Sequence, residues 1–249
     1  MALNKEVNKL RKGKIGMLFR NKVLLTANVL LIYYKEFRDL LKKILVGHPV
    51  KPYMKHKEID IIIELLEKKK PKYCLEYGSG YSTCFFRKYI NKNTLWVSVE
   101  HDRYWADKIR HMVGANTKVY YVPPNNYPWT DKHCDGSYRD LRDYIKFPRS
   151  LGIKFDLILI DGRARKYCLI EALNLLNRDG IVILHDANRK YYLTPCKLYK
   201  YQVFFTDHHK DSGGLWIGSK DLDINTILDI KKHKEIWKVL SLFEKWVKV

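Results

Sequence analysis

Short apolar runs alternate with helical segments along the chain from about residue 57 onward. Ile59, Ile62, Ile63 and Leu66 recur at helical spacing with charged residues between them, which predicts an amphipathic helix. Further helices are predicted over residues 83–89, 104–112 and 166–176. Strands are predicted over residues 73–77, 95–100, 118–122, 155–160 and 181–184. This alternation predicts an α/β fold with a doubly wound, mostly parallel sheet.

The later strands add detail to this sheet. Residues 155–160 are nearly all apolar, which is typical of a parallel strand that is buried on both faces. Residues 201–206 and 214–218 are expected to close the sheet as a final pair, including an antiparallel strand.

The first 50 residues have a different pattern and are expected to form a basic helical extension. Lys and Arg flank an apolar run over residues 23–34, and this run is shorter than the roughly 20 residues of a transmembrane helix. No small-residue cleavage site follows the run, so a secretory signal is not favoured. Three roles stay open for this helix: contact with a membrane surface, association with a partner or a second copy, and packing on the domain. His48-Pro49 and Lys51-Pro52 are expected to mark the entrance to a domain over residues 51–249.

Composition narrows the classes of protein. The 249 residues are 46% hydrophobic, which suits one folded α/β domain and excludes compositional disorder. Five scattered cysteines match neither a zinc site nor a fully paired disulfide framework, so we expect a cytoplasmic location, with peripheral membrane attachment as the alternative. The net charge of +20 favours an anionic partner, although a general lysine bias would produce the same value.

A glycine-rich turn follows the first predicted strand. It reads Glu76-Tyr77-Gly78-Ser79-Gly80-Tyr81-Ser82-Thr83, and Gly78 and Gly80 let the backbone turn sharply and approach a ligand. Open α/β sheets bind ligands at the carboxyl ends of their strands, where this turn lies. Glu100 ends the next strand and is placed to accept hydrogen bonds from a ribose diol, whereas Asp102 is expected to cap the following helix.

Two further strands end in polar residues. Residues 155–160 lead into Asp161-Gly162-Arg163-Ala164-Arg165, and residues 181–184 lead into His185-Asp186. Each of these residues could serve as a cap or a hydrogen-bond partner. Since all of them follow successive strands, we expect Asp161, His185 and Asp186 to converge beside the glycine turn.

These motifs resemble those of the class I S-adenosylmethionine-dependent methyltransferases over roughly residues 55–220. The resemblance implies a Rossmann-like methyltransferase sheet and S-adenosylmethionine as cofactor, with the glycine turn at the methionine part and Glu100 at the ribose. The cofactor-binding residues that it implies are Glu76, Gly78, Ser79, Gly80, Ser82, Thr83, Glu100, His101 and Asp161. The fuller motif set is similar to a subgroup of sugar O-methyltransferases that includes the plant glucuronoxylan enzymes.

A looser similarity to the metal-dependent catechol-type O-methyltransferases raises the question of Mg²⁺ or Mn²⁺. In that comparison Asp161 and Asp186 match two metal ligands, but Ala187 stands where the family has Asn. Ala164 stands where the family has its lysine, and Asn188 could replace the missing ligand by a shift of one register.

Methyl transfer to an alcohol requires a base within about 2.6–3.2 Å of the hydroxyl. The candidate bases are Asp161 and His185, with Asp186 orienting the imidazole. Arg163 and Arg165 could bind a carboxylate or phosphate of the acceptor. The aromatic residues that could form walls of the acceptor site are Trp105, Trp129, Tyr138 and Tyr192.

The sequence therefore predicts a methyltransferase that acts on a hydroxyl of a sugar or glycan. The alternatives are a methyltransferase for RNA, protein or a catechol-like small molecule, and a non-enzymatic protein that binds anionic surfaces through a degenerate methyltransferase fold. No RNA-binding motif is visible, so nucleic acid is the less favoured partner.

Overall fold

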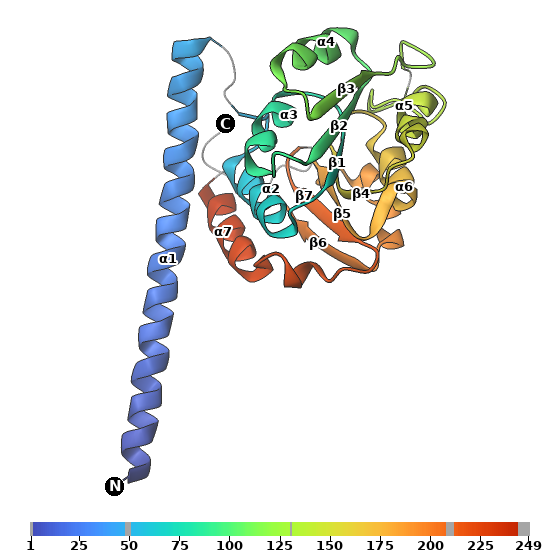
Figure 1. The fold of residues 1–249 in the computed structure, drawn as a ribbon. Helices are drawn as coiled ribbons and strands as arrows, with labels where there is room; N and C mark the ends of the chain where they lie inside the picture. Colours follow the sequence, from blue (N-terminus) through green and yellow to red (C-terminus); the bar gives the residue numbers. More distant parts are fainter. Residues whose placement is uncertain (1, 48–50, 130, 208–211, 244–249) are drawn as a thin grey trace.

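The computed structural model describes residues 2–47, 51–129, 131–207 and 212–243, and it describes side chains from residue 22 to residue 241 within those ranges. The part of the prediction that named His48-Pro49 as a helix break lies outside the described residues. A central sheet with helices on both sides forms the body of the molecule, and one long helix lies against it (Figure 1).

The sheet has seven strands in the order β3-β2-β1-β4-β5-β7-β6. The strands are β1 (Tyr73–Tyr77), β2 (Leu95–Glu100), β3 (Thr117–Tyr121), β4 (Phe155–Ile160), β5 (Leu176–His185), β6 (Tyr201–Phe205) and β7 (Leu215–Ser219). Strands β1 to β5 pair in parallel, whereas β7 lies antiparallel between β5 and β6. The predicted doubly wound, mostly parallel sheet with an antiparallel closing strand is confirmed.

Seven α-helices are present in the described part of the chain. They are α1 (Ala2–Val46), α2 (His56–Lys69), α3 (Tyr81–Phe86), α4 (Arg103–Met112), α5 (Arg142–Lys146), α6 (Arg165–Leu175) and α7 (Ile230–Phe243). Short 3₁₀ turns cover Arg87–Tyr89, Phe147–Leu151, Lys190–Tyr192, Thr194–Leu198 and Ile224–Thr226. Asp102 caps α4 as predicted, because its side chain accepts a hydrogen bond from the Trp105 backbone N–H at 3.0 Å.

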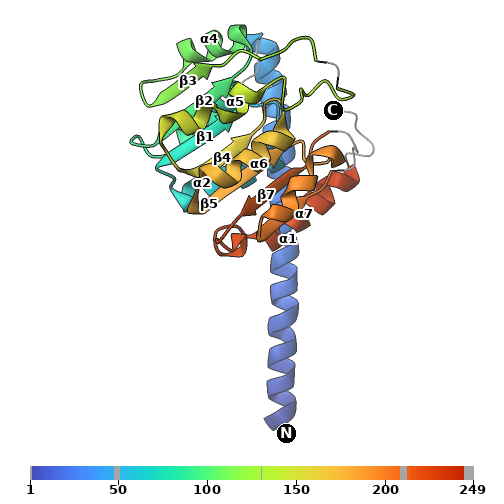
Figure 2. The same ribbon diagram turned by 90° about the vertical axis from the view of Figure 1, so that its right-hand side faces the viewer.

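The sheet is buried on both faces because its central strands are mostly apolar on both sides. On β4, Ile158 and Ile160 pack toward α5 and α6, whereas Leu157 and Leu159 pack toward α2, α3 and α7. Figures 1 and 2 show these two helical layers on opposite sides of the sheet. The two layers leave the carboxyl ends of the parallel strands as the edge where polar side chains gather.

The apolar run at residues 23–34 lies inside the single 45-residue helix α1. Val29 and Ile32 of α1 pack against Ile236 and Leu240 of α7, and the amino-terminal part of α1 extends past the domain (Figures 1 and 2). In the described portion of the chain, no helix is both long and apolar enough to cross a bilayer.

Several predicted boundaries need correction. Strand β5 begins at Leu176 rather than at residue 181, because Leu176 already pairs with Phe155 across a register irregularity. The helix after the glycine turn begins at Tyr81, two residues before its predicted start. It becomes a 3₁₀ turn at Arg87. Helices α5 and α7 were not predicted. Helix α5 has only five residues, which is too short for a periodic pattern.

Truncating Leu159 to alanine is expected to destabilise the protein by about 2–5 kcal/mol, since the side chain is fully buried in the middle of the sheet. Urea unfolding measures this loss as a shift in the transition midpoint. Leu198→Ala is the matched control, because Leu198 is 51% exposed and should change stability by less than about 0.5 kcal/mol. Equal losses in the two variants would contradict the described core.

Candidate functional site

The glycine turn is formed by close contact between the tips of β1 and β4. Gly78 has a left-handed backbone (φ +93°), and a Cβ there would lie 2.4 Å from the Cα of Gly162. The Asp161 backbone N–H also donates to the Tyr77 carbonyl at 3.0 Å. Gly80, by contrast, has extended backbone, and a Cβ there would come near only the Ser82 hydroxyl at 3.7 Å. Gly78 is therefore required by the fold, whereas Gly80 leaves open space beside the turn.

Glu76 holds this turn together from below. Its buried carboxylate accepts hydrogen bonds from the Ser82 hydroxyl (2.5 Å), the Thr83 hydroxyl (2.6 Å) and the Trp96 indole N–H (3.0 Å). Burial raises the pKa of Glu76 to about 7, and the three donors only partly oppose this rise. Of the residues predicted to bind cofactor, Glu76 and Thr83 thus shape the turn from its buried side.

Glu100 lies at the tip of β2, almost fully buried. One carboxylate oxygen accepts the Ser79 backbone N–H at 2.6 Å, and the other accepts the backbone N–H groups of His101 and Asp102 at 2.9 Å each. The His101 ring nitrogen Nδ1 lies 2.8 Å from the same carboxylate. These contacts hold the carboxylate in one orientation beside the glycine turn.

A cavity of about 450 Å³ opens at this edge of the sheet. Its lining includes nine of the predicted site residues, namely Gly78, Ser79, Gly80, Ser82, Glu100, His101, Asp161, Arg163 and Arg165. Trp105, which was predicted as a possible wall of the acceptor site, also lines it. Five further lining residues were not predicted to bind the cofactor or the acceptor, namely Tyr53, Tyr81, Asp102, Gly162 and Arg189. The tips of β1, β2 and β4, which are far apart in the sequence, therefore meet around one cavity, whereas His185 and Asp186 at the tip of β5 are not among the residues that line it.

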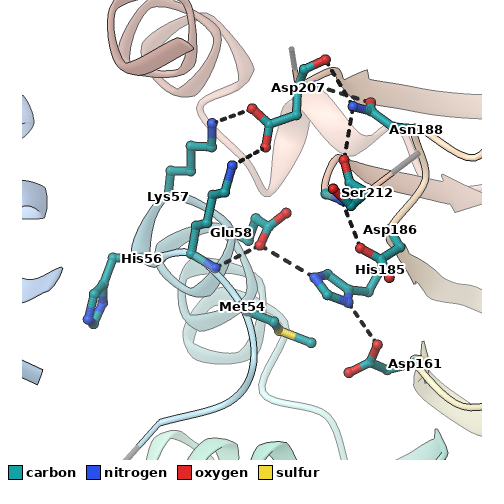
Figure 3. A network of polar contacts seen from close by, with 12 residues as sticks. Met54, His56, Lys57, Glu58, Asp161, His185, Asp186, Asn188, Asp207 and Ser212 are labelled. Atoms are coloured by element: carbon teal, nitrogen blue, oxygen red, sulfur yellow. Dashed lines mark hydrogen bonds and ion pairs between the residues drawn. The ribbon is translucent and has the colours of Figure 1, made fainter. Parts of the chain in front are cut away.

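A carboxylate–imidazole–carboxylate chain stands beside the cavity (Figure 3). His185 Nδ1 lies 2.7 Å from Asp161 Oδ1, and His185 Nε2 lies 3.4 Å from Glu58 Oε2. Burial alone would lower the pKa of His185, but the two carboxylates outweigh it and raise that pKa well above its usual value. For Asp161, burial acts in the opposite direction and raises the pKa. The positive charges of His185 and Arg165 outweigh this effect, so the net shift of the Asp161 pKa is downward. His185 is therefore protonated and Asp161 ionised at neutral pH.

Glu58 was not predicted as a site residue. It lies in the first turn of α2, where its carboxylate also accepts the Lys55 backbone N–H at 2.8 Å. A glutamate three residues after a helix cap has an ordinary explanation in helix capping. The sequence therefore carries no signal that Glu58 approaches His185, 127 positions away.

Arg165 joins the tips of β4 and β5 from a buried position. Its guanidinium donates to the backbone carbonyls of Gly162 (2.8 Å), His185 (2.8 Å) and Asp161 (3.0 Å). It also lies 3.3 Å from the Asp161 carboxylate and 3.4 Å from that of Asp186. The predicted acceptor-binding arginine is thus directed mainly at the protein itself, whereas Arg163 is exposed at the cavity.

Asp186 and Tyr192 stand outside the cavity lining, and the His185 ring is oriented by Asp161 and Glu58 rather than by Asp186 as predicted. Asp186 has a left-handed backbone (φ +57°), accepts the Gly213 backbone N–H at 2.8 Å and pairs with Arg189 at 3.2 Å. Tyr192 is fully buried, and its hydroxyl donates to Asp135 at 3.0 Å. The predicted role of Tyr192 as a wall of the acceptor site does not match this buried position.

Asp161 and Asp186, the two predicted metal ligands, both contact the same arginine. The guanidinium of Arg165 lies between the carboxylates of Asp161 and Asp186, where its positive charge opposes a cation. The Asn188 amide is directed away, donating to the backbone carbonyls of Asp207 (2.9 Å) and Ser212 (3.3 Å). Across the described residues, no group of three or more His, Cys, Asp or Glu could hold a metal ion. These residues do not fit Mg²⁺ or Mn²⁺.

Comparison with solved structures identifies the fold. No protein-family model and no curated protein sequence matches the chain. A proposed O-methyltransferase from Klebsiella pneumoniae aligns at 18% identity over 74% of this chain and 88% of that chain, with a TM-score of 0.51. The O-methyltransferase from Bacillus cereus, solved with SAH, aligns at 14% identity over 74% and 89%, with a TM-score of 0.50. The chain has the Rossmann-like methyltransferase fold. Neither solved protein is described with a sugar acceptor.

The raised pKa of Glu76 leads to a prediction about stability. Between about pH 4.5 and pH 7 the folded protein keeps a proton on Glu76 that the unfolded chain loses, so the free energy of unfolding falls as pH rises through this window. Glu76→Gln cannot ionise and should lose this part of the pH dependence. Thermal melts at pH 5, 6 and 7 measure the effect, with exposed Glu67→Gln as the matched control. Parallel pH profiles for Glu76→Gln and wild type would contradict the assignment.

Proposed function

We propose that the protein transfers the methyl group of S-adenosylmethionine to a hydroxyl oxygen of a sugar or glycan. The observation that carries this proposal is the single cavity in which an oriented glutamate, Glu100, and an ionised aspartate, Asp161, stand on either side of the Gly78–Gly162 contact. The fold of the chain, which it shares with the two solved proteins, supports the reaction class.

The residues of the glycine turn suit a nucleoside cofactor. Three backbone N–H groups hold the Glu100 carboxylate in place, and its Oε2 accepts only one of them, so this oxygen can also accept a hydrogen bond from a ribose hydroxyl. The space beside Gly80 admits the methionine part of the cofactor against the backbone. When bound, S-adenosylmethionine supplies an electrophilic methyl group on a positively charged sulfur.

Asp161 is the group best placed to take the acceptor proton. The acceptor oxygen must be aligned with the methyl carbon and the sulfur, and its proton must leave as the new bond forms. Asp161 is ionised and lines the cavity, so it can accept this proton. His185 is already protonated and donates to Asp161, so it acts as a positioning residue, and Glu58 holds it from the other side.

The choice of a sugar acceptor is supported by the side chains around the cavity. Exposed Tyr53 contacts Tyr81 edge to face, with ring centroids 6.2 Å apart, and Trp105 adjoins Tyr81 at 5.9 Å. Aromatic faces of this kind pack against the apolar face of a sugar ring. Arg163 adds a guanidinium that can bind a carboxylate or phosphate, which favours an anionic sugar.

Glu100→Ala is expected to weaken the binding of S-adenosylmethionine by about 10- to 100-fold, because a charged acceptor for the ribose is lost. Isothermal titration calorimetry measures the change directly. Glu67→Ala, on an exposed face of α2, is the control for loss of one carboxylate. An unchanged affinity in Glu100→Ala would refute the ribose assignment.

Asp161→Asn is expected to reduce turnover by about 100-fold or more while cofactor affinity changes only a few-fold, since the amide cannot accept the proton. The assay uses labelled S-adenosylmethionine with a panel of nucleotide sugars, glycans, catechols and RNA, so the labelled product also identifies the acceptor class. Near-normal turnover by Asp161→Asn would remove Asp161 from the mechanism.

Glu58→Gln serves as the companion variant. It leaves Asp161 in place but removes one of the two carboxylates that keep His185 protonated. We expect a smaller loss of turnover, together with a downward shift in the pH at which activity changes. A purely structural role for Glu58 would lower the melting temperature without moving the pH profile.

A further inference from the structure

Helix α1 has an apolar face that points away from the domain. Val29 and Ile32 point inward to α7, and Asp39 points inward to His56. On a helix with about 100° per residue, the opposite side carries a second apolar row centred about 150° away. This outward face of α1 consists of Leu30, Tyr34, Phe37, Leu41, Ile44 and Leu45, which are 44–84% exposed.

The outward face is wide as well as apolar. Its six members span an arc of about 100°, and none of the described side chains on that arc carries a charge. Leu31 and Leu40 flank the arc on either side and are also about half exposed. A seam between two helices in a coiled coil is narrower than this, whereas a helix that lies in a membrane interface needs a broad apolar face.

The charges of α1 separate the possible occupants. The helix contains eleven Lys or Arg against three Asp or Glu. Two of these acids are used by the domain: Glu36 accepts the His56 backbone N–H at 2.7 Å, and Asp39 lies 2.7 Å from the His56 ring. Exposed Lys22 and Lys42 flank the apolar face on its two sides. A second copy of α1 would bring like charges together, whereas an anionic lipid surface attracts them.

We infer that the outward face of α1 binds the surface of an anionic membrane, with the helix lying in the plane of the interface. Phe37 and the leucine and isoleucine side chains enter the boundary of the acyl chains, and Tyr34 places its hydroxyl at the level of the headgroups. The lysines that flank the face contact the lipid phosphates. The domain stays on the opposite side of α1, where α7 and α2 already contact the helix.

Flotation of the full chain with lipid vesicles tests this inference. We expect binding to vesicles of phosphatidylcholine with added phosphatidylserine, much weaker binding to phosphatidylcholine alone, and loss of binding as salt rises from about 0.1 M to about 1 M. The double variant Phe37→Ser/Leu41→Ser removes apolar surface without changing charge. It should weaken binding to the anionic vesicles by about tenfold or more.

The matched control is Leu198→Ser. Leu198 is a similarly exposed leucine, but it lies outside α1, in the 3₁₀ turn that follows β5. It should bind vesicles like the wild type, and the melting temperatures of all variants should agree. Equal binding by wild type and the double variant would overturn the inference, because general positive charge would then explain the attraction. In the other contrary outcome, the wild type forms dimers that the double variant does not form, and it fails to bind vesicles. That result would overturn the inference and identify a second copy of the chain as the partner of the outward face. Neither readout depends on methyl transfer.

Discussion

The contact between Gly78 and Gly162 is the constraint on which the site depends. A Cβ on either residue would overlap the backbone of the other, so only two glycines let the tips of β1 and β4 come this close. The approach places the turn that follows β1 directly beside Asp161, and Glu100 joins them because β2 pairs with β1 in parallel. The position of every carboxylate at the cavity follows from this one backbone contact together with the order of the strands.

Much of the fold could be predicted because the strands are buried on both faces. Runs such as Phe155–Ile160 are apolar at nearly every position and end at Gly, Pro or charged residues, so β1, β2 and β4 were located to the residue. Helix α7 was missed although its Ile236, Trp237 and Leu240 have helical spacing. The start of β5 was missed because Leu176 pairs across an irregularity that only the neighbouring strand reveals.

The candidate site, like the fold, could be predicted only in part. Residues at strand tips, such as Glu100 and Asp161, could be predicted because strand order alone brings them to one edge. The partners that set their charge could not, since Glu58 comes from a helix 127 positions away from His185 and has an ordinary capping role in its own turn. Arg165 was predicted to bind an acceptor, but its guanidinium instead donates to backbone carbonyls at the strand tips. These carbonyls come together only in the assembled sheet, so the sequence does not reveal them.

The place of β7 in the sheet has a consequence for biosynthesis. As the chain leaves the ribosome, β5 emerges before β7, and β7 is the strand that covers one edge of β5 and provides the only strand neighbour of β6 in the described sheet. Until Leu215–Ser219 have emerged, the backbone groups along that edge of β5 face solvent without partners. The nascent protein therefore passes through an interval in which β5 is open to pairing with another chain, and this interval closes only when β7 has emerged.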